Sequence, residues 1–240
     1  MNPSELKKVS INMPQMCIGG LSERWLLQEL GDLQWRLLCD GLQTNSNQLQ
    51  DENGNRLYAT FVRIRWQSLH SLIDFKESEE TIIKGKISAY GGMHFGNFNC
   101  TSVAFPNKSI EADLMTIFSI RKDSDNQSLA KGKHTLKTNT IQQEKSLPDF
   151  GLEYRKIKLK KQSEVILAGE VFTIDSQALY EKEYSIIPYH DINGVGLLYF
   201  ATYVSINDIC EASYLNAKPT DTRWELNTYT LARDVFYYEN

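Results

Sequence analysis

The sequence has few residues that could bind a metal ion. Among its 240 residues are four histidines and four cysteines, and Cys17, Cys39, Cys100 and Cys210 lie far apart without a CxxC pair. This spacing excludes a zinc site with closely spaced ligands. Scattered cysteines of this kind are typical of buried, reduced thiols in a cytoplasmic protein. We therefore expect neither a metal nor a cofactor.

Long hydrophobic runs and an excess of positive charge are also missing. No apolar run approaches the length of about 18 residues that a membrane span needs, and residues 1–15 lack the apolar centre of a signal peptide. We therefore expect a cytoplasmic protein with no membrane partner. The net charge is −4 and the isoelectric point about 5.7, which argues against a nucleic-acid-binding surface across the whole protein.

The apolar pattern predicts one long helix followed by strands. Within residues 21–38, the residues Leu26, Leu30, Leu33 and Leu37 recur at helical spacing. Alternating runs then predict strands at residues 58–66, 83–89 and 114–120. A helix followed by several strands indicates an α+β fold in which a sheet wraps around the helix.

The composition changes after this first set of strands. Residues 122–150 contain few apolar side chains, which predicts a polar linker or a long, mobile loop. Further strands are expected around residues 164–173 and 179–187, and a second apolar helix at residues 195–210.

The entries to the two predicted helices resemble each other. Residues 14–21 and 188–195 share the placement of a proline, an isoleucine, a glycine and a final apolar residue. We interpret this as a tandem repeat, with chance similarity of two amphipathic helices as the alternative. The expected units are residues 1–121 and 151–240, joined by the linker at 122–150. The second unit is expected to be incomplete, because too few residues follow its helix for a full set of strands.

The second helix entry carries a recognisable motif. In the stretch YHDINGVGLLYFATY at residues 189–203, the order Asp191, Asn193 and Gly196 before an aromatic-rich helix resembles the helix entry of hot-dog thioesterases. Asn193 stands where these enzymes carry an acid, and a neutral amide is a poor base and nucleophile, which argues against hydrolysis. Asn193 and Gly194 are predicted to bind the substrate, with the amide as a donor. The alternative is a turn without such a role.

The first helix entry resembles a more specific family. The stretch MPQMCIGGLSERWLLQELGDLQW at residues 13–35, RLYA at 56–59 and RDVFY at 233–237 are similar to the leinamycin-type acyltransferase/decarboxylase family of polyketide biosynthesis. The resemblance implies a double hot-dog fold, in which each of two tandem units wraps an antiparallel sheet around a long central helix. It also implies decarboxylation of methylmalonyl-CoA and transfer of the acyl group to an acyl carrier protein, with Tyr58 in the active site.

The resemblance also sets the expected partners. Coenzyme A enters as part of the acyl-CoA substrate rather than as a cofactor, and an acyl carrier protein receives the product. We expect no nucleic acid among the partners, and a homodimer that pairs sheet edges. The basic run at residues 155–161 is predicted to be a solvated edge strand. A docking surface for coenzyme A phosphates or an acidic carrier protein is the alternative.

Decarboxylation of a malonyl-type thioester leaves an enolate, whose oxygen needs hydrogen-bond donors. A helix N-terminus supplies free N–H groups. Gly20, Leu21 and Ser22 lead into such a terminus and are predicted to be catalytic, and Gly19 is predicted to let the substrate approach the backbone closely. The alternative is that the glycines only make the turn and that Ser22 only caps the helix.

Tyr58 has two predicted roles in this chemistry. It acts either as a nucleophile, which needs an activating base or cation, or as a neutral donor to the thioester oxygen or the substrate carboxylate. The alternative is a core tyrosine whose hydroxyl bonds to the backbone. Two other functions stay open: a thioesterase or dehydratase on the same fold, and a non-catalytic hot-dog module that binds carrier proteins.

Overall fold

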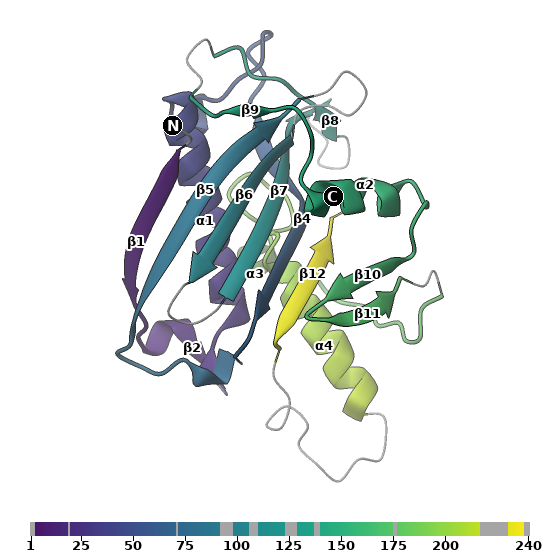
Figure 1. The fold of residues 1–240 in the computed structure, drawn as a ribbon. Coiled ribbons are helices and arrows are strands. Elements are labelled where there is room, and N and C mark those ends of the chain that lie inside the picture. The colour runs from purple at the N-terminus through teal and green to yellow at the C-terminus, as the bar shows by residue number, and fades with distance from the viewer. Residues whose placement is uncertain are drawn as a thin grey trace.

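An eight-stranded sheet is the largest element of the computed structural model (Figure 1). The structure describes residues 3–18, 20–70, 72–91, 98–105, 110–122, 129–136, 140–174, 177–216 and 230–237. The main path of the sheet is antiparallel throughout, in the order β1 (Ser4–Ser10), β5 (Glu80–Tyr90), β6 (Phe98–Phe105), β7 (Ile110–Arg121), β4 (Tyr58–Ser68) and β12 (Ala232–Phe236). The three strands predicted in the first half of the chain are β4, β5 and β7.

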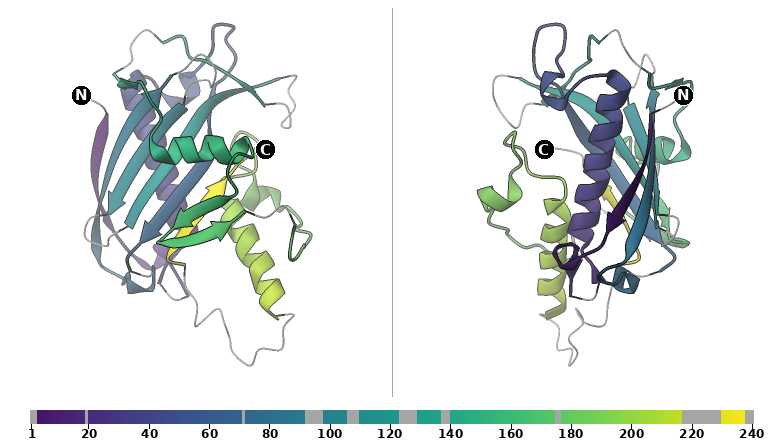
Figure 2. Two further views of the ribbon diagram at one scale, coloured as in Figure 1. Left: turned by 45° about the vertical axis from the view of Figure 1, so that its right-hand side comes forward. Right: turned by 90° about the vertical axis from the view of Figure 1, so that its left-hand side faces the viewer.

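The predicted first helix is α1 (Glu23–Leu42), which the sheet wraps (Figure 2). The side chain of Ser22 caps it by accepting a hydrogen bond from the Trp25 N–H group at 3.3 Å. The leucines at helical spacing are all buried against the inner face of the sheet. The helix runs four residues further than expected, because Leu42 is still buried and the left-handed Gln43 ends it.

The opposite, outer face of the sheet is covered in part by α2 (Asp149–Lys158), as Figure 2 shows. Phe150, Tyr154 and Ile157 are its buried face. The prediction of an edge strand at residues 155–161 is therefore wrong: the run is the end of α2 and the turn after it. The helical spacing of the buried residues outweighs the local alternation, and basic side chains favour a helix C-terminus.

Part of the predicted linker belongs to the sheet. β8 (Leu129–Lys131) pairs with β7, and β9 (Gln143–Glu144) pairs in parallel with β5. The segment at 122–150 is therefore not a loop throughout, because short backbone pairing needs few apolar side chains. The division of the chain at these boundaries stays a prediction.

The second half contributes helices, a hairpin and one strand of the large sheet. Its elements are β10 (Glu164–Leu167), β11 (Glu170–Thr173), α3 (Pro188–Asp191), α4 (Thr202–Asn216) and β12. β10 and β11 form the strands expected at 164–173, whereas residues 179–187 form no strand. In the described residues, the second predicted unit adds β12 to the first sheet, beside β4, and wraps no sheet of its own around α4.

The second long helix starts seven residues later than predicted. Residues 193–201 form turns, because the Asn193 side chain binds backbone N–H groups and Gly196 is left-handed, with φ +79°. The matched segments both begin with a short helical turn at a proline, namely η1 (Met13–Gln15) and α3. The remaining short elements are β2 (Met16–Cys17), β3 (Gly20–Leu21), η2 (Ser46–Gln48) and η3 (Leu72–Asp74).

Candidate active site

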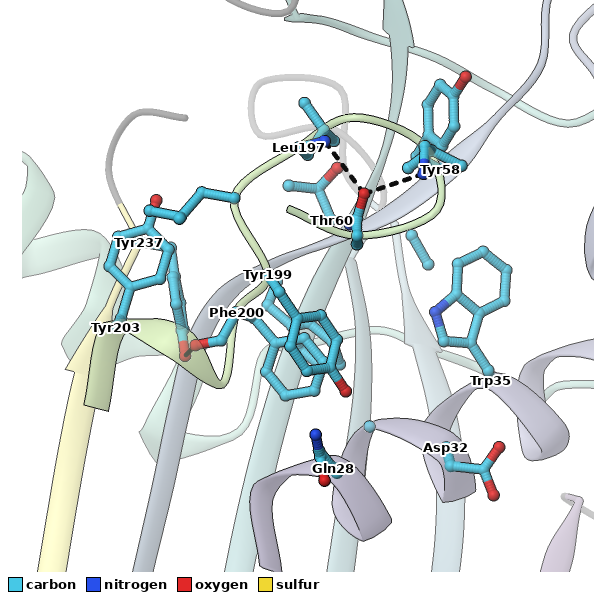
Figure 3. A pocket seen from close by; sticks show the side chains of 16 residues that line it. Gln28, Asp32, Trp35, Tyr58, Thr60, Leu197, Tyr199, Phe200, Tyr203 and Tyr237 are labelled. Carbon is cyan, nitrogen blue, oxygen red and sulfur yellow. Dashed lines mark hydrogen bonds between the residues drawn. The ribbon is translucent and has the colours of Figure 1, made fainter. Parts of the chain in front are cut away.

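A cavity of about 290 Å³ lies where α1, the start of β4 and the segment before α4 meet (Figure 3). Its wall combines aromatic rings with a few polar groups. The lining residues are Gln28, Gly31, Asp32, Trp35, Tyr58, Ala59, Thr60, Phe61, Asn193, Val195, Leu197, Leu198, Tyr199, Phe200, Tyr203 and Tyr237. A concave, largely aromatic site with a few polar groups is the usual form of a small-molecule site.

Two elements of the first half open onto this cavity. On α1, Gln28, Asp32 and Trp35 recur at helical spacing on a face beside the leucines of the core. On β4, residues 58–61 lie beyond the end of β12, which pairs with β4 only from Arg63 onward. This part of the β4 edge therefore borders the cavity and not a neighbouring strand.

Asn193 is held in place by the loop that it organises. Its Oδ1 atom accepts hydrogen bonds from the N–H groups of Val195 at 3.1 Å and Leu197 at 3.0 Å. Its own backbone N–H donates to the Leu197 carbonyl at 2.8 Å. Because two N–H groups donate to it, this terminal atom of the Asn193 side chain must be the oxygen and the other must be the NH₂ nitrogen. The NH₂ group is left to act as a hydrogen-bond donor.

Asp191, the other polar residue of the motif, has a structural role. It is buried, and its Oδ2 atom accepts hydrogen bonds from the Tyr184 hydroxyl at 2.9 Å and the Ile187 N–H group at 2.7 Å. Both bonds tie Asp191, the last residue of α3, to the segment that precedes this helix. Asp191 does not line the cavity.

Phe200 and its neighbours form the aromatic wall. The Phe200 ring centre lies 4.5 Å from that of Phe61, and the Phe200 carbonyl accepts a hydrogen bond from the Tyr237 hydroxyl at 3.1 Å. Burial raises the pKa of Tyr199, Tyr203 and Tyr237 above the ordinary phenol value, so these hydroxyls are neutral at pH 7. The hydroxyls of Tyr199 and Tyr203 can therefore serve as donors but not as bases, whereas that of Tyr237 already donates to the Phe200 carbonyl.

Gly31 allows this wall to approach α1. A Cβ atom at this position would lie 2.4 Å from Cζ of the Phe200 ring. Only a glycine therefore lets the ring rest directly on the helix backbone.

Tyr58 lies at the rim of the cavity, with its hydroxyl directed away from the Tyr199 and Phe200 rings (Figure 3). Two guanidinium groups flank its ring: that of Arg56 is 5.5 Å and that of Arg121 5.4 Å from the ring centre. Such cation–π contacts hold the ring in place and give this end of the cavity a positive charge.

The residues predicted at the first helix entry lie elsewhere. The Trp66 Nε1 atom donates to the Glu23 carboxylate at 2.9 Å, which places the start of α1 beside the far end of β4. Eight residues separate Tyr58 from Trp66, so the two predicted parts of the site are about 27 Å apart along the strand. The structure therefore brings Tyr58 and Asn193 together at one cavity and does not bring Gly20, Leu21 or Ser22 to it.

These three residues have evident structural roles instead. A Cβ atom at Gly20, where φ is +138°, would lie 2.2 Å from the Leu72 carbonyl oxygen, so glycine is needed for backbone packing. Leu21 is buried in the core, and Ser22 caps α1. A catalytic role for them stays a prediction.

Of the two remaining predicted residues, Gly194 is not among those that line the cavity. Gly194 is exposed, and a Cβ atom at this position would meet no other atom within 4 Å, whereas Gly19 lies outside the described residues. The polar face of α1 and the tyrosines at 199, 203 and 237 were not predicted from the sequence. The spacing of Gln28, Asp32 and Trp35 was the available signal, because three large or polar residues on one helix side mark a second contact surface.

The described residues also bear on metal binding and membrane insertion. Within the described ranges, no group of three or more His, Cys, Asp or Glu side chains is arranged to hold a metal ion. No helix in the described part of the chain is long and apolar enough to cross a membrane.

Comparison with solved structures identifies the fold. The 12:0-ACP thioesterase from Umbellularia californica aligns over 92% of this chain and 72% of its own, with a TM-score of 0.54 and 10% sequence identity. A protein described as an oleoyl thioesterase from Lactobacillus plantarum aligns over 89% of this chain and 73% of its own, with a TM-score of 0.53 and 10% identity. The chain has a hot-dog fold.

The predicted α+β hot-dog architecture is thereby confirmed, with α1 as the central helix of the hot-dog sheet, whereas the described residues of the second predicted unit wrap no sheet around a helix of their own. No family model matches the sequence, and no curated protein matches it significantly. At 10% identity the likeness concerns the hot-dog fold alone. The activity must therefore be argued from the cavity.

Proposed function

We propose that this hot-dog protein is an enzyme that acts on acyl thioesters of coenzyme A or of an acyl carrier protein, and that hydrolysis is its main reaction. The observation that carries the proposal is the cavity before α4, which Asn193 lines together with several aromatic rings. The thioesterases with the same fold support the choice of substrate class.

Any reaction at a thioester carbonyl needs a donor for the oxygen that becomes negative. The NH₂ group of Asn193 can donate this hydrogen bond, because two backbone N–H groups already hold its oxygen. A donor that is fixed before the substrate binds does not have to reorganise during the reaction. The rings of Tyr199 and Phe200 provide apolar surface for the acyl chain.

Hydrolysis also needs a base. Asp32 is the only carboxylate among the described residues that line the cavity. Its side chain is 58% exposed and pairs with Arg36, so it stands at the rim with access to water. In the proposed step Asp32 takes a proton from water, the oxygen attacks the carbonyl carbon, the C–S bond breaks, and the proton passes to the sulfur. The products are a carboxylic acid and a thiol.

Decarboxylation with acyl transfer is the second candidate. It is favoured by the amide of Asn193, which suits an enolate oxygen, and by the two cations that flank Tyr58. In that reaction the carboxylate leaves as carbon dioxide and the enolate carbon takes a proton. The acyl group then passes to the thiol of an acyl carrier protein as its bond to the coenzyme A sulfur breaks, and the carrier thiol's proton ends on the released coenzyme A. Tyr58 either carries the acyl group in between or donates a hydrogen bond.

A panel of substrates separates the two candidates. The purified protein is incubated with octanoyl-CoA, propionyl-CoA and methylmalonyl-CoA, with and without a carrier protein, and thiol, carbon dioxide and acylated carrier are measured. Release of thiol and free acid from octanoyl-CoA supports hydrolysis. Carbon dioxide and acylated carrier from methylmalonyl-CoA, both abolished in Tyr58→Phe, support the second candidate. No product from any of these thioesters would contradict the proposal.

A further inference from the structure

Two nitrogen atoms of the guanidinium group of Arg121, the last residue of β7, have no hydrogen-bond acceptor among the described residues. Its Nε and Nη2 atoms are closed off from solvent, and no described residue accepts a hydrogen bond from them. Such an arrangement is rare, because each N–H group that loses water needs an acceptor. The arrangement therefore indicates that an acceptor from outside the described chain belongs beside Arg121.

A second arginine strengthens this indication. Arg56 and Arg121 lie 5.5 and 5.4 Å from the centre of the same Tyr58 ring. Neither forms an ion pair with a carboxylate in the described ranges, and Asp51, in the turn before Arg56, instead accepts hydrogen bonds from the N–H groups of Asn53 and Asn55. Two unpaired cations beside one side chain attract an anion.

The sheet adds a third positive charge on the same side. Tyr58 pairs with Ser119 across β4 and β7, and Ser119 pairs with Lys131 across β7 and β8. Residues that pair directly across an antiparallel sheet point to the same face. Arg121 points to this face too, because it lies two residues after Ser119 on the same strand. This face therefore carries Arg121 on β7 and Lys131 on β8 beside Tyr58, and Arg56 lies two residues before the start of β4.

We propose that Arg56 and Arg121 bind the phosphate at the far end of the pantetheine arm of the substrate. The inference rests on the proposed function, because every thioester of coenzyme A or of a carrier protein carries this phosphate. Tyr58 joins the two sites: it borders the cavity, and its hydroxyl points outward from the aromatic wall. The guanidinium fork of an arginine matches two phosphate oxygens, and a turn of the Arg121 side chain toward the phosphate would give its covered N–H groups the acceptors that they lack.

The test compares two substrates that differ only beyond the pantetheine arm. For the wild type, Arg56→Gln and Arg121→Gln, kcat/KM is measured with octanoyl-CoA and with octanoyl-pantetheine, which lacks the phosphate. The wild type is expected to prefer octanoyl-CoA, and each variant to lower this preference about tenfold through KM. Lys122→Gln, which removes a charge from an exposed neighbouring residue, should change the preference less than about twofold. An unchanged preference in both arginine variants would overturn the inference.

An octanoyl-carrier protein distinguishes the two sources of the phosphate. A similar loss of kcat/KM for octanoyl-CoA and for the octanoyl-carrier protein supports binding of the shared pantetheine phosphate. A loss for octanoyl-CoA alone would overturn it in favour of the nucleotide part of coenzyme A.

A binding measurement keeps the inference separate from the activity. Inorganic pyrophosphate should raise the melting temperature of the wild type more than sodium chloride of equal ionic strength, and Arg56→Gln, at an exposed position, should remove this difference. Arg121→Lys, which keeps the charge and loses the fork, serves if Arg121→Gln does not fold. A wild type that turns over no thioester but responds to pyrophosphate refutes the proposed function alone. No response in the wild type refutes the subsite.

Discussion

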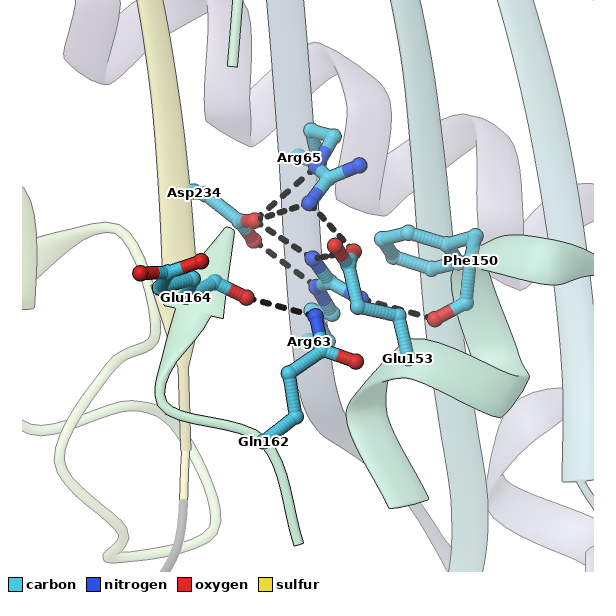
Figure 4. A network of polar contacts seen from close by, with 7 residues as sticks. All are labelled: Arg63, Arg65, Phe150, Glu153, Gln162, Glu164 and Asp234. Carbon is cyan, nitrogen blue, oxygen red and sulfur yellow. Dashed lines mark hydrogen bonds and ion pairs between the residues drawn. The ribbon is translucent and has the colours of Figure 1, made fainter. Parts of the chain in front are cut away.

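Replacing Asp234 by alanine tests how the last strand is joined to the rest of the sheet. Asp234 lies on β12 and accepts hydrogen bonds from Nε and Nη2 of Arg63, at 2.8 and 2.5 Å, and of Arg65, at 2.9 and 2.7 Å (Figure 4). Arg63 is fully buried, with its guanidinium 4.5 Å from the ring centres of Phe150 and Phe236. The substitution removes the main counterion of a charge that water cannot reach.

The expected loss of stability depends on the hydrogen bonds that Arg63 keeps in the variant. Removal of one partner from a buried ion pair costs about 3–5 kcal/mol. Arg63 still donates to Glu153 at 2.6 Å and to the Phe150 carbonyl at 2.7 Å, so we expect a loss near the lower end, about 3 kcal/mol. Asp234→Asn keeps the shape and one acceptor, and should lose less.

The free energy of unfolding is measured from urea titrations followed by circular dichroism, with the slope compared between variants. Asp208→Ala is the matched control, because Asp208 pairs with Arg233 at 2.9 Å but its side chain is 51% exposed. An exposed pair contributes about 1 kcal/mol or less. If Asp234→Ala lost no more than Asp208→Ala, the argument from the buried charge would be refuted.

Three further predictions concern the cavity wall, the cap of α1 and the pH dependence of stability. Gly31→Ala should displace the Phe200 ring, because the new Cβ atom would lie 2.4 Å from it, and should lower kcat/KM about tenfold or more while the fold is retained. Unchanged kcat/KM in this variant would mean that Phe200 is not part of the site. Ser22→Ala should lower the free energy of unfolding by about 1 kcal/mol and leave kcat/KM unchanged, and a large kinetic loss would instead restore the α1 N-terminus to the site. The free energy of unfolding should fall as the pH rises from about 9 to 12. Burial raises the pKa of Cys100 and of Tyr154 to about 12, so only the unfolded chain releases these protons in that range. Cys100→Ala should make this fall with pH less steep, and an unchanged slope would contradict the assignment of the effect to Cys100.

The first half of the fold could be predicted because its elements have regular patterns. The leucines of α1 keep helical spacing, and β4, β5 and β7 alternate along most of their length. The prediction was wrong at residues 155–161, where a period of two in the charges hid the helical period of Phe150, Tyr154 and Ile157. A local pattern loses to a pattern set by packing on the sheet.

The site could be predicted only in part. The motif pointed to Asn193, and the family resemblance to Tyr58, and both border the cavity. The sequence did not show that α4 starts only at Thr202, because this depends on how the Asn193 side chain binds the backbone. Nor did it show which helix entry faces the start of β4, since that is decided by the pairing of β12 with the other end of β4.

The role of Asn193 as a donor tests the central claim most directly. Asn193→Asp keeps an oxygen for the N–H groups of Val195 and Leu197, and it replaces the NH₂ group by a negative charge beside the thioester oxygen. The measurement is kcat/KM with octanoyl-CoA, together with the melting temperature. The account predicts a loss of about 100-fold or more with the melting temperature little changed. An unchanged or higher kcat/KM would contradict it, because the position would then act as a base or take no part in the reaction.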